Sequence, residues 1–394
     1  MNQKLFEFIQ FNPTERLAKG TLAKKVPMEY LQPFTRAISD YETAEYSGGS
    51  KFRNGDTLMA RITPCLENGK TAYVSILDDG EVGFGSTEYI VFRNIEGVTD
   101  SKFVYYFVTS PWFREIAIKS MVGSSGRQRV QQSVLENLEV TLPPLDEQRR
   151  IAGILGSLDD KIELNRRINA NLEAQAQALF RSWFVDFEPF RDGPFVDSEL
   201  GKIPQGWKVG DIYTYMDVIY GSPYKSALFN TNKKGYPLIR IRDLKTYSPQ
   251  FYTEEILPNT EYVDFGDIVA GMDAEFVPYI WKGEKGLLNQ RVCKFIPKYD
   301  YVSKYYILSL IRPELEFVQS YKVGTTVSHL GKSDIDKFKV ITPPAEIVKR
   351  FSRIVGSFHQ QIIKLAKENL NLSALRDTLL PKLMAGEIKI RETY

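Results

Sequence analysis

The sequence repeats itself at a constant offset of 200 residues. Eleven residues between positions 140 and 172 recur without a gap between positions 340 and 372. They are Val140, Pro143, Pro144, Arg150, Ile154, Gly156, Ser157, Ile162, Asn169, Asn171 and Leu172. Because 200 residues is about half of the 394-residue chain, the repeat predicts two copies of one unit, each a variable segment followed by a helix. A single active site does not require two copies, whereas contact with two similar targets does.

Each copy is expected to become helical directly after a Pro-Pro pair. Pro143-Pro144 and Pro343-Pro344 end strand-like stretches, because proline lacks a backbone donor and restricts the residue before it. Apolar residues then recur at alternating spacings of four and three, which is typical of a coiled-coil seam. The helices should end near Pro189 and at Pro381. The predicted seam residues are Ile151, Leu155, Leu158, Ile162, Asn169 and Leu172 in the first copy and Phe351, Val355, Phe358, Ile362, Asn369 and Leu372 in the second.

Two features indicate that these helices pair with each other. Gly156 and Gly356 lie inside helices, where glycine is costly, so a close approach of backbones is expected there. Asn169 and Asn369 occupy the same seam position in the two copies, where a polar residue can determine the register of the helix pair. The alternatives are a locally flexible helix at the glycines and an exposed seam end at the asparagines.

The variable segments, residues 1 to about 142 and 200 to 342, have the pattern of mixed α/β domains. Aromatic and β-branched runs such as Thr71–Ile76 and Glu88–Phe92 alternate with glycine-rich turns. Asn54–Ala60 is similar to Phe265–Ala270, which indicates one fold in both segments.

Composition argues against several classes of protein. No apolar run approaches the roughly 20 residues of a membrane span, and the N-terminus lacks the apolar core of a secretory signal. With only Cys65, Cys293, His329 and His359, we expect neither disulfides nor a metal site. These features favour the reducing cytoplasm. The net charge of +2 is weak for an isolated nucleic-acid binder, but it fits one that shares phosphate contacts with basic partners.

No catalytic motif is complete. Asn68–Thr71 resembles the end of a phosphate-binding loop, but Pro64 stands where the first glycine belongs and a strand-like run follows. Acidic pairs such as Asp159-Asp160 are interpreted as solvated surface. We therefore expect a non-catalytic chain without a cofactor.

Polar, basic and glycine-flanked stretches remain, and these residue types can contact DNA. Arginine can bind guanine, asparagine and glutamine can bind adenine, and hydroxyl groups can bind phosphates. Ordinary polar turns are the alternative for each stretch. In the first copy the candidates are Arg61, Thr63, Asn68, Lys70, Thr71, Ser86, Thr87, Ser124, Ser125, Arg127, Gln128 and Arg129. In the second they are Arg240, Arg242, Asn289, Gln290, Arg291, Thr325, Thr326, Ser328 and His329.

Several motifs resemble those of type I restriction-modification specificity subunits. Leu142–Leu155 (LPPLDEQRRIAGIL) is similar to the family's central region, together with Leu158–Asn165 and Leu179–Phe184. Leu379–Ile388 resembles its C-terminal region, and Ile203–Trp207 (IPQGW) and Leu287–Val292 are typical of its second target-recognition domain.

The resemblance implies a mixed α/β fold in which two target-recognition domains are separated by two long antiparallel helices, with an internal pseudo-two-fold repeat. It places domain 1 at residues 1–144, a central spacer at 145–190, a linker and domain 2 at 191–343, and a C-terminal spacer at 344–394. It also implies that double-stranded DNA is bound at an asymmetric, interrupted site. The expected partners are two methyltransferase subunits that methylate adenine N6 with S-adenosylmethionine, and ATP-dependent restriction subunits.

Two other classes stay open on sequence alone. A fused restriction-modification enzyme would need a methyltransferase or nuclease motif that is not recognisable in the chain. A coiled-coil interaction protein that does not bind DNA would account for the helices but not for the two large variable segments.

Overall fold

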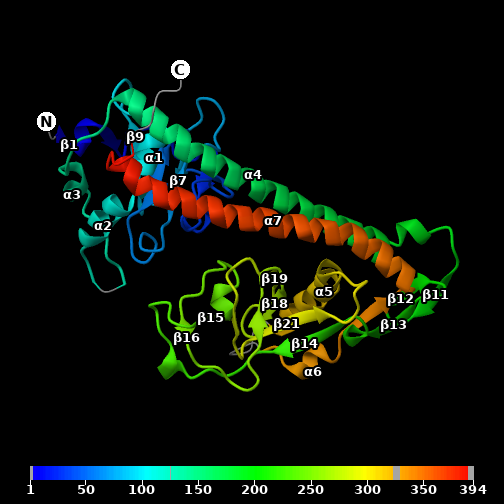
Figure 1. The fold of residues 1–394 in the computed structure, drawn as a ribbon. Coiled ribbons are helices and arrows are strands. Elements are labelled where there is room, and N and C mark those ends of the chain that lie inside the picture. The colour runs from blue at the N-terminus through cyan, green and yellow to red at the C-terminus, as the bar shows by residue number, and fades with distance from the viewer. Residues whose placement is uncertain (1–2, 125, 323–328, 389–394) are drawn as a thin grey trace. The chain divides into compact units, whose positions relative to one another are not determined.

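The computed structural model describes residues 3–124, 126–322 and 329–388 (Figure 1). The chain divides into two compact units, one of residues 1–164 with 369–394 (unit 1) and one of residues 165–368 (unit 2). The boundaries fall inside two helices of 40 residues, α4 (Leu145–Phe184) and α7 (Ala345–Met384). Each unit therefore contains one variable segment and a part of both long helices. None of the helices in the described ranges combines the length and hydropathy needed to span a lipid bilayer.

Unit 1 contains two four-stranded sheets. The first, in the order β2-β9-β6-β7, is antiparallel throughout. The second, in the order β4-β3-β8-β5, contains one parallel pair, β3 with β8. A short ribbon pairs β1 with β10, which precedes α4. The strands are β1 (Gln3–Lys4), β2 (Ile9–Phe11), β3 (Leu22–Val26), β4 (Glu42–Glu45), β5 (Lys51–Phe52), β6 (Thr57–Ala60), β7 (Thr71–Tyr73), β8 (Gly83–Gly85), β9 (Tyr89–Asn94) and β10 (Glu139–Val140).

Unit 2 builds the same sheets in the same order. Its antiparallel sheet is β14-β21-β18-β19, its mixed sheet is β16-β15-β20-β17 with β15 parallel to β20, and its ribbon is β13-β22. An additional hairpin, β11 (Phe195–Ser198) with β12 (Gly201–Pro204), precedes them. The other strands are β13 (Lys208–Asp211), β14 (Met216–Tyr220), β15 (Tyr236–Ile239), β16 (Tyr252–Thr253), β17 (Tyr262–Val263), β18 (Ile268–Gly271), β19 (Pro278–Ile280), β20 (Gly286–Leu288), β21 (Val292–Pro297) and β22 (Lys339–Thr342).

The remaining helices also correspond between the units. In unit 1, α1 (Ser101–Thr109) and α2 (Pro111–Lys119) are separated at Ser110, whose side chain caps α2, and α3 (Gln132–Glu136) precedes β10. In unit 2, α5 (Lys304–Lys322) is a single helix, and α6 (Lys332–Ile335) precedes β22. Single-turn 3-10 helices are η1 (Leu5–Glu7), η2 (Met28–Tyr30), η3 (Glu188–Phe190), η4 (Ile212–Thr214), η5 (Ser226–Leu228) and η6 (Ile241–Asp243).

The duplication predicted from the repeat is confirmed by this shared topology. The register agrees as well, since Thr57 pairs with Phe92 in unit 1 as Ile268 pairs with Phe295 in unit 2. The turn before each central strand is the same, because Gly55 and Gly266 both have a φ of 92°. Only glycine adopts this φ without strain, which explains why the similarity of Asn54–Ala60 to the second copy survived in the sequence.

Each variable segment completes its core with the long helices. In unit 1, Leu155 of α4 and Leu383 of α7 join the cluster around α1. In unit 2, an aromatic cluster joins Phe184 of α4 to Phe351 of α7, with ring centroids 4.8 Å apart, and includes Trp207 from the linker. The helices are therefore part of each core rather than an appendage to it.

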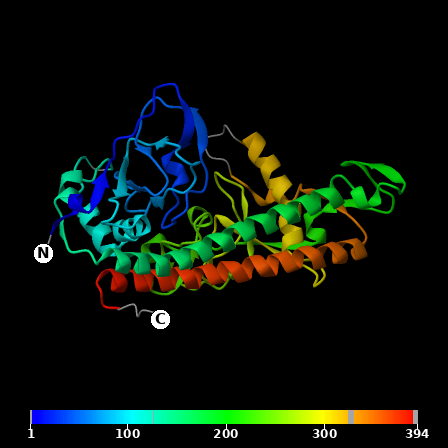
Figure 2. The same ribbon diagram turned by 90° about the horizontal axis from the view of Figure 1, so that it is seen from above.

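The segments of α4 and α7 within each unit lie side by side and antiparallel (Figures 1 and 2). In unit 2, Asn169 Nδ2 donates to the carbonyl oxygen of Ile362 at 3.3 Å. In unit 1, Asn369 Nδ2 donates to the carbonyl oxygen of Ile162, also at 3.3 Å. The two hydrogen bonds are equivalent, because Asn169 and Ile162 of the first copy correspond to Asn369 and Ile362 of the second. The twelve predicted seam residues are all buried or half-buried.

Two details of the helices differ from the prediction. A Cβ at Gly156 would lie 3.8 Å from Arg36 Nη1, and one at Gly356 would lie 3.7 Å from Ser303 Cβ. Both glycines therefore lie closest to their variable domain, and the expected approach between helices at these positions is wrong. Helix α7 also continues through Pro381 to Met384, because Leu380 and Leu383 are buried in the unit 1 core. This burial offsets the backbone hydrogen bond that proline cannot form.

A buried ion pair joins the two helices in unit 1. Asp159 is 4% exposed and accepts hydrogen bonds from Arg376 Nη1 and from the Tyr106 hydroxyl, both at 2.7 Å. Burial alone would lower the pKa of Arg376, but Asp159 and Asp377 raise it above its usual value. The interpretation of Asp159 as solvated surface is therefore wrong, because the seam position opposite it carries an arginine.

Removing one partner of this ion pair should destabilise unit 1. Asp159→Ala leaves the Arg376 guanidinium buried with only Asp377, and we expect unfolding free energy to fall by roughly 3 kcal/mol in urea titrations. The double variant Asp159→Leu/Arg376→Met should recover most of that loss, since no buried charge remains. Glu115→Ala, which breaks an exposed ion pair, is the matched control and should have no measurable effect. Equal losses for Asp159→Ala and the double variant would contradict this account.

His359 of α7 should make unit 2 sensitive to acid. It is 4% exposed, and burial together with the charge of Lys304 lowers its pKa to about 4, against a smaller opposing effect of Asp267. Since the folded pKa lies below the unfolded value of about 6.5, stability is complete above pH 6.5 and falls as the pH drops from 6.5 towards 4. The loss attributable to His359 is roughly 3 kcal/mol. The unfolding free energy, measured between pH 6.5 and 4, should fall less in His359→Leu than in the wild-type protein. Parallel pH curves for the two proteins would show that His359 is not responsible for the acid sensitivity.

Candidate nucleic-acid interface

Three of the predicted DNA-contacting stretches meet in unit 1 although they are far apart in the sequence. Residues 61–63 follow β6, residues 86–88 join β8 to β9, and residues 122–124 and 126–130 follow α2. The Arg61 N–H donates to the carbonyl oxygen of Glu88 and the Val130 N–H to that of Arg61, both at 2.9 Å. The Thr63 N–H donates to the carbonyl oxygen of Gln128 at 3.0 Å. These backbone bonds hold the three stretches together. We call the surface made by these stretches recognition surface 1.

Two charged side chains of recognition surface 1, Arg129 and Glu88, form an ion pair. Arg129 donates three hydrogen bonds to the Glu88 carboxylate, at 2.6, 3.0 and 3.0 Å. These bonds hold the pKa of Glu88 below its usual value and raise that of Arg129. Arg127, Ser124 and Thr87 are exposed. Ser86 and Gln128 are half-buried, and Ser125 lies outside the described residues.

The fourth predicted stretch of unit 1 is more structural than expected. Thr71 lies in β7 and is 2% exposed, so its side chain is not available to a DNA groove in this structure. Lys70 Nζ donates to the carbonyl oxygen of Met28 at 2.9 Å. Thr63, which belongs to the first stretch, donates to the Glu67 carboxylate at 2.9 Å. Asn68 is exposed. The physical reason is that this stretch is the turn into β7, where Thr71 is buried in the domain and Lys70 binds a nearby main-chain carbonyl group.

Unit 2 repeats the backbone frame of recognition surface 1. The Met272 N–H donates to the carbonyl oxygen of Arg291 at 2.9 Å, and the Leu330 N–H donates to that of Met272 at 2.7 Å. Bridges join Ile62 to Arg129 in unit 1 and Asp273 to His329 in unit 2. Position by position, Ile62, Glu88 and Arg129 therefore correspond to Asp273, Arg291 and His329. We call the unit 2 frame recognition surface 2.

The side chains of recognition surface 2 form a different charged cluster. His329 Nδ1 lies 2.6 Å from an Asp273 carboxylate oxygen, and Arg291 Nε lies 3.3 Å from the other. Arg291 Nη1 lies 3.4 Å from His329 Nδ1. Gln290 is exposed, whereas Asn289 is only 9% exposed. The predicted contacts Thr325, Thr326 and Ser328 lie outside the described residues.

The two arginines after β15 have different environments. The Arg240 guanidinium stacks on the ring of Phe251 at 4.3 Å, and its Nε lies 3.3 Å from an Asp243 carboxylate oxygen. Its side chain is 18% exposed, so it is largely held within the domain. Arg242 is exposed on η6.

Sequence reasoning did not select the carboxylates that hold the arginines. Glu88 and Asp273 contact Arg129 and Arg291, but neither is among the predicted contact residues. Phe34 was also missed: it is 56% exposed, has a φ of 51°, and stacks against the Arg114 guanidinium at 4.8 Å. An alignment of the two copies by strand, rather than by the constant offset, would have drawn attention to Asp273.

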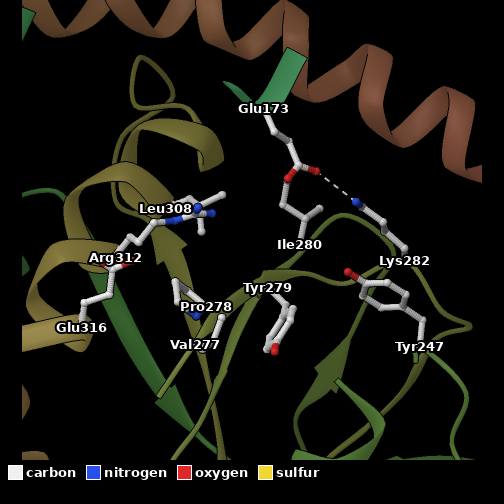
Figure 3. Close-up of a pocket in the computed structure, with 10 residues that line it drawn as sticks. All are labelled: Glu173, Tyr247, Val277, Pro278, Tyr279, Ile280, Lys282, Leu308, Arg312 and Glu316. Carbon is white, nitrogen blue, oxygen red and sulfur yellow. Dashed lines mark hydrogen bonds and ion pairs between the residues drawn. The ribbon is translucent and has the colours of Figure 1, made fainter. Parts of the chain in front are cut away.

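A separate cavity of about 260 Å³ lies in unit 2 between α4, β19 and α5 (Figure 3). On one wall Glu173 and Lys282 point toward each other and form an ion pair of 3.1 Å, with Tyr247 beside the lysine. Burial and the Glu173 carboxylate raise the pKa of the Tyr247 hydroxyl. None of the predicted DNA contacts that the structure describes lines this cavity. Within the described ranges no group of three or more His, Cys, Asp or Glu side chains is placed to hold a metal ion.

Comparisons with known proteins agree on one family. The family model described as the type I restriction modification DNA specificity domain matches residues 3–174 and again residues 204–372. The type I restriction enzyme MjaIX specificity subunit of Methanocaldococcus jannaschii is 31% identical over 76% of this chain and 72% of its own length. The HindI specificity subunit of Haemophilus influenzae is 25% identical over 89% and 90% of the two chains. The crystal structure of the type I restriction-modification S subunit from M. genitalium aligns with a TM-score of 0.49 at 16% identity, covering 99% and 96% of the chains.

Proposed function

This chain belongs to the family of type I restriction-modification DNA specificity proteins, and we propose that it supplies the sequence specificity of such a complex without carrying out chemistry itself. The observation that carries the proposal is the double family match. Each matched segment contains the same two sheets and the same frame of recognition loops. Two equivalent frames with different side chains suit two readers of different sequences.

Each recognition surface would read one half of an interrupted, asymmetric DNA site. Exposed Arg127 and Arg129 in unit 1 and Arg291 and Gln290 in unit 2 are of the types that contact base edges in the major groove. Ser124, Thr87 and Asn68 are exposed in turns and loops, and Arg242 is exposed on η6; side chains and backbone amides at such positions can contact phosphates.

The partners would be two methyltransferase subunits, which methylate adenine N6, and restriction subunits that translocate and cleave DNA. With a net charge of +2, this chain neutralises few phosphates by itself, and basic partner subunits would supply the remainder of the electrostatic attraction. The exposed faces of α4 and α7 would provide the docking surface. The same helices would set the distance between the two half-sites.

Removing the gene from its host should erase one methylation pattern. We expect methylome sequencing to show a single interrupted adenine-methylated motif that disappears on deletion and returns when the gene is restored beside its methyltransferase partner. Purified chain alone should transfer no methyl group from S-adenosylmethionine to DNA. An unchanged methylome, or methylation by the isolated chain, would contradict the proposal.

The spacer role predicts the effect of lengthening both helices together. One heptad inserted between residues 164 and 165 and another between 368 and 369 preserves the antiparallel pairing and adds about 10 Å to the pair. At 3.4 Å per base pair the unmethylated gap in the motif should widen by about three base pairs, while both half-sites keep their sequences. Methylome sequencing of the complemented strain measures this change. A new half-site with an unchanged gap would rule out the spacer role.

A further inference from the structure

Each recognition surface carries one guanidinium–carboxylate pair on the shared backbone frame, and we propose that this pair selects a G·C base pair in each half-site. The inference rests on the proposed function and adds to it the residues and the base pair. In unit 1 the pair is Arg129 with Glu88. In unit 2 it is Arg291 with Asp273, joined by His329.

The pairs occupy different positions of the frame. Backbone hydrogen bonds make Glu88 equivalent to Arg291, and the bridges make Ile62 equivalent to Asp273. The arginine of unit 2 thus stands where unit 1 has its carboxylate, and the carboxylate of unit 2 stands where unit 1 has isoleucine. The frame is preserved while the charges on it are rearranged, as expected where backbone geometry is structural and side chains determine specificity.

Stability does not account for these pairs. The side chains of Arg129 and Glu88 are 45% and 24% exposed, and those of Arg291 and Asp273 are 51% and 25% exposed. Ion pairs at such exposure contribute little to folding. By contrast, Asp159 and Arg376, whose separation should destabilise unit 1, are 4% and 11% exposed.

The geometry of the Arg129–Glu88 pair matches the edge of a G·C pair, and in unit 2 the Arg291 guanidinium lies beside Asp273 and His329. Arg129 holds Glu88 with its Nε and Nη2 atoms, and this two-pronged edge of a guanidinium also fits the O6 and N7 acceptors of guanine. A carboxylate can accept the N4 amino group of cytosine. On binding, each member of the pair would exchange its partner for one base. Before binding, the carboxylate keeps the guanidinium ordered, which lowers the entropy cost of recognition.

Other basic side chains of the surfaces are less suited to this role. Arg240 is stacked on Phe251 and held by Asp243, and Lys70 is bound to the Met28 carbonyl oxygen. Arg127 is exposed, and among the described residues no carboxylate is paired with it as Glu88 is with Arg129.

The test is Arg129→Gln in the complete complex with its methyltransferase partner, using methylation of a duplex library in which every position of the motif is varied. Glutamine suits adenine rather than guanine. At one G·C position in one half-site, the preference of methylation for G·C over the other base pairs should therefore fall by about 5- to 150-fold. The other half-site should not change. Arg291→Gln should give the same result in the opposite half-site, and Glu88→Gln should act at the same base pair as Arg129→Gln.

Two further variants separate base reading from folding and from phosphate contact. Arg129→Lys retains the charge but removes the two-pronged donor, so discrimination should fall at the same base pair while the melting temperature is maintained. Lys119→Gln, which alters an exposed ion pair on α2, is the matched control and should leave the motif unchanged.

The outcomes distinguish this inference from the proposed function. A wild-type complex that methylates no interrupted motif would overturn the proposed function and this inference with it. A normal wild-type motif that is identical in folded Arg129→Gln and Arg291→Gln complexes would overturn only the inference. An equal loss of methylation at every sequence would also overturn it, because that result indicates a phosphate contact.

Discussion

The structure depends on the packing of both long helices into the core of each unit. Neither variable segment closes its hydrophobic core alone: unit 1 uses Leu155 from α4 and Leu383 from α7, and unit 2 uses Phe184 and Phe351. A helix that contributes to a core is held in one rotation about its axis, so its remaining faces have a defined direction. The recognition loops of each unit are therefore attached to a rigid element rather than to a flexible linker.

Polar contacts then determine the register of the helix pair. Asn169 and Asn369 each bind a carbonyl oxygen of the opposite helix, and Asp159 binds Arg376 where the first copy has Ala176 at the equivalent seam position. An apolar seam tolerates sliding by a heptad, whereas a buried ion pair does not, because displacement would leave two charges without partners. The duplicated sequence is thus symmetric in its fold and asymmetric in the interaction that holds unit 1.

Within each recognition surface, main-chain groups and side chains have different roles. Hydrogen bonds between main-chain groups, such as Arg61 with Glu88 and Met272 with Arg291, build the frame and are indifferent to side-chain type. Side chains on that frame can change without altering the fold. Two copies of one gene segment can in this way come to recognise different sequences.

The sequence alone determined the features that are local. The start of each helix after a Pro-Pro pair, the seam spacing and the duplicated turn at Gly55 and Gly266 depend on residues close together in the chain, and all were predictable. Only the tertiary structure decided that Glu88 holds Arg129, that Asp159 is buried, that Thr71 is interior and that Gly156 contacts Arg36. These outcomes depend on groups between 41 and 217 residues apart that meet only after the sheets and helices have packed. Periodicity records which face of an element is apolar, but not which distant side chain will lie against it.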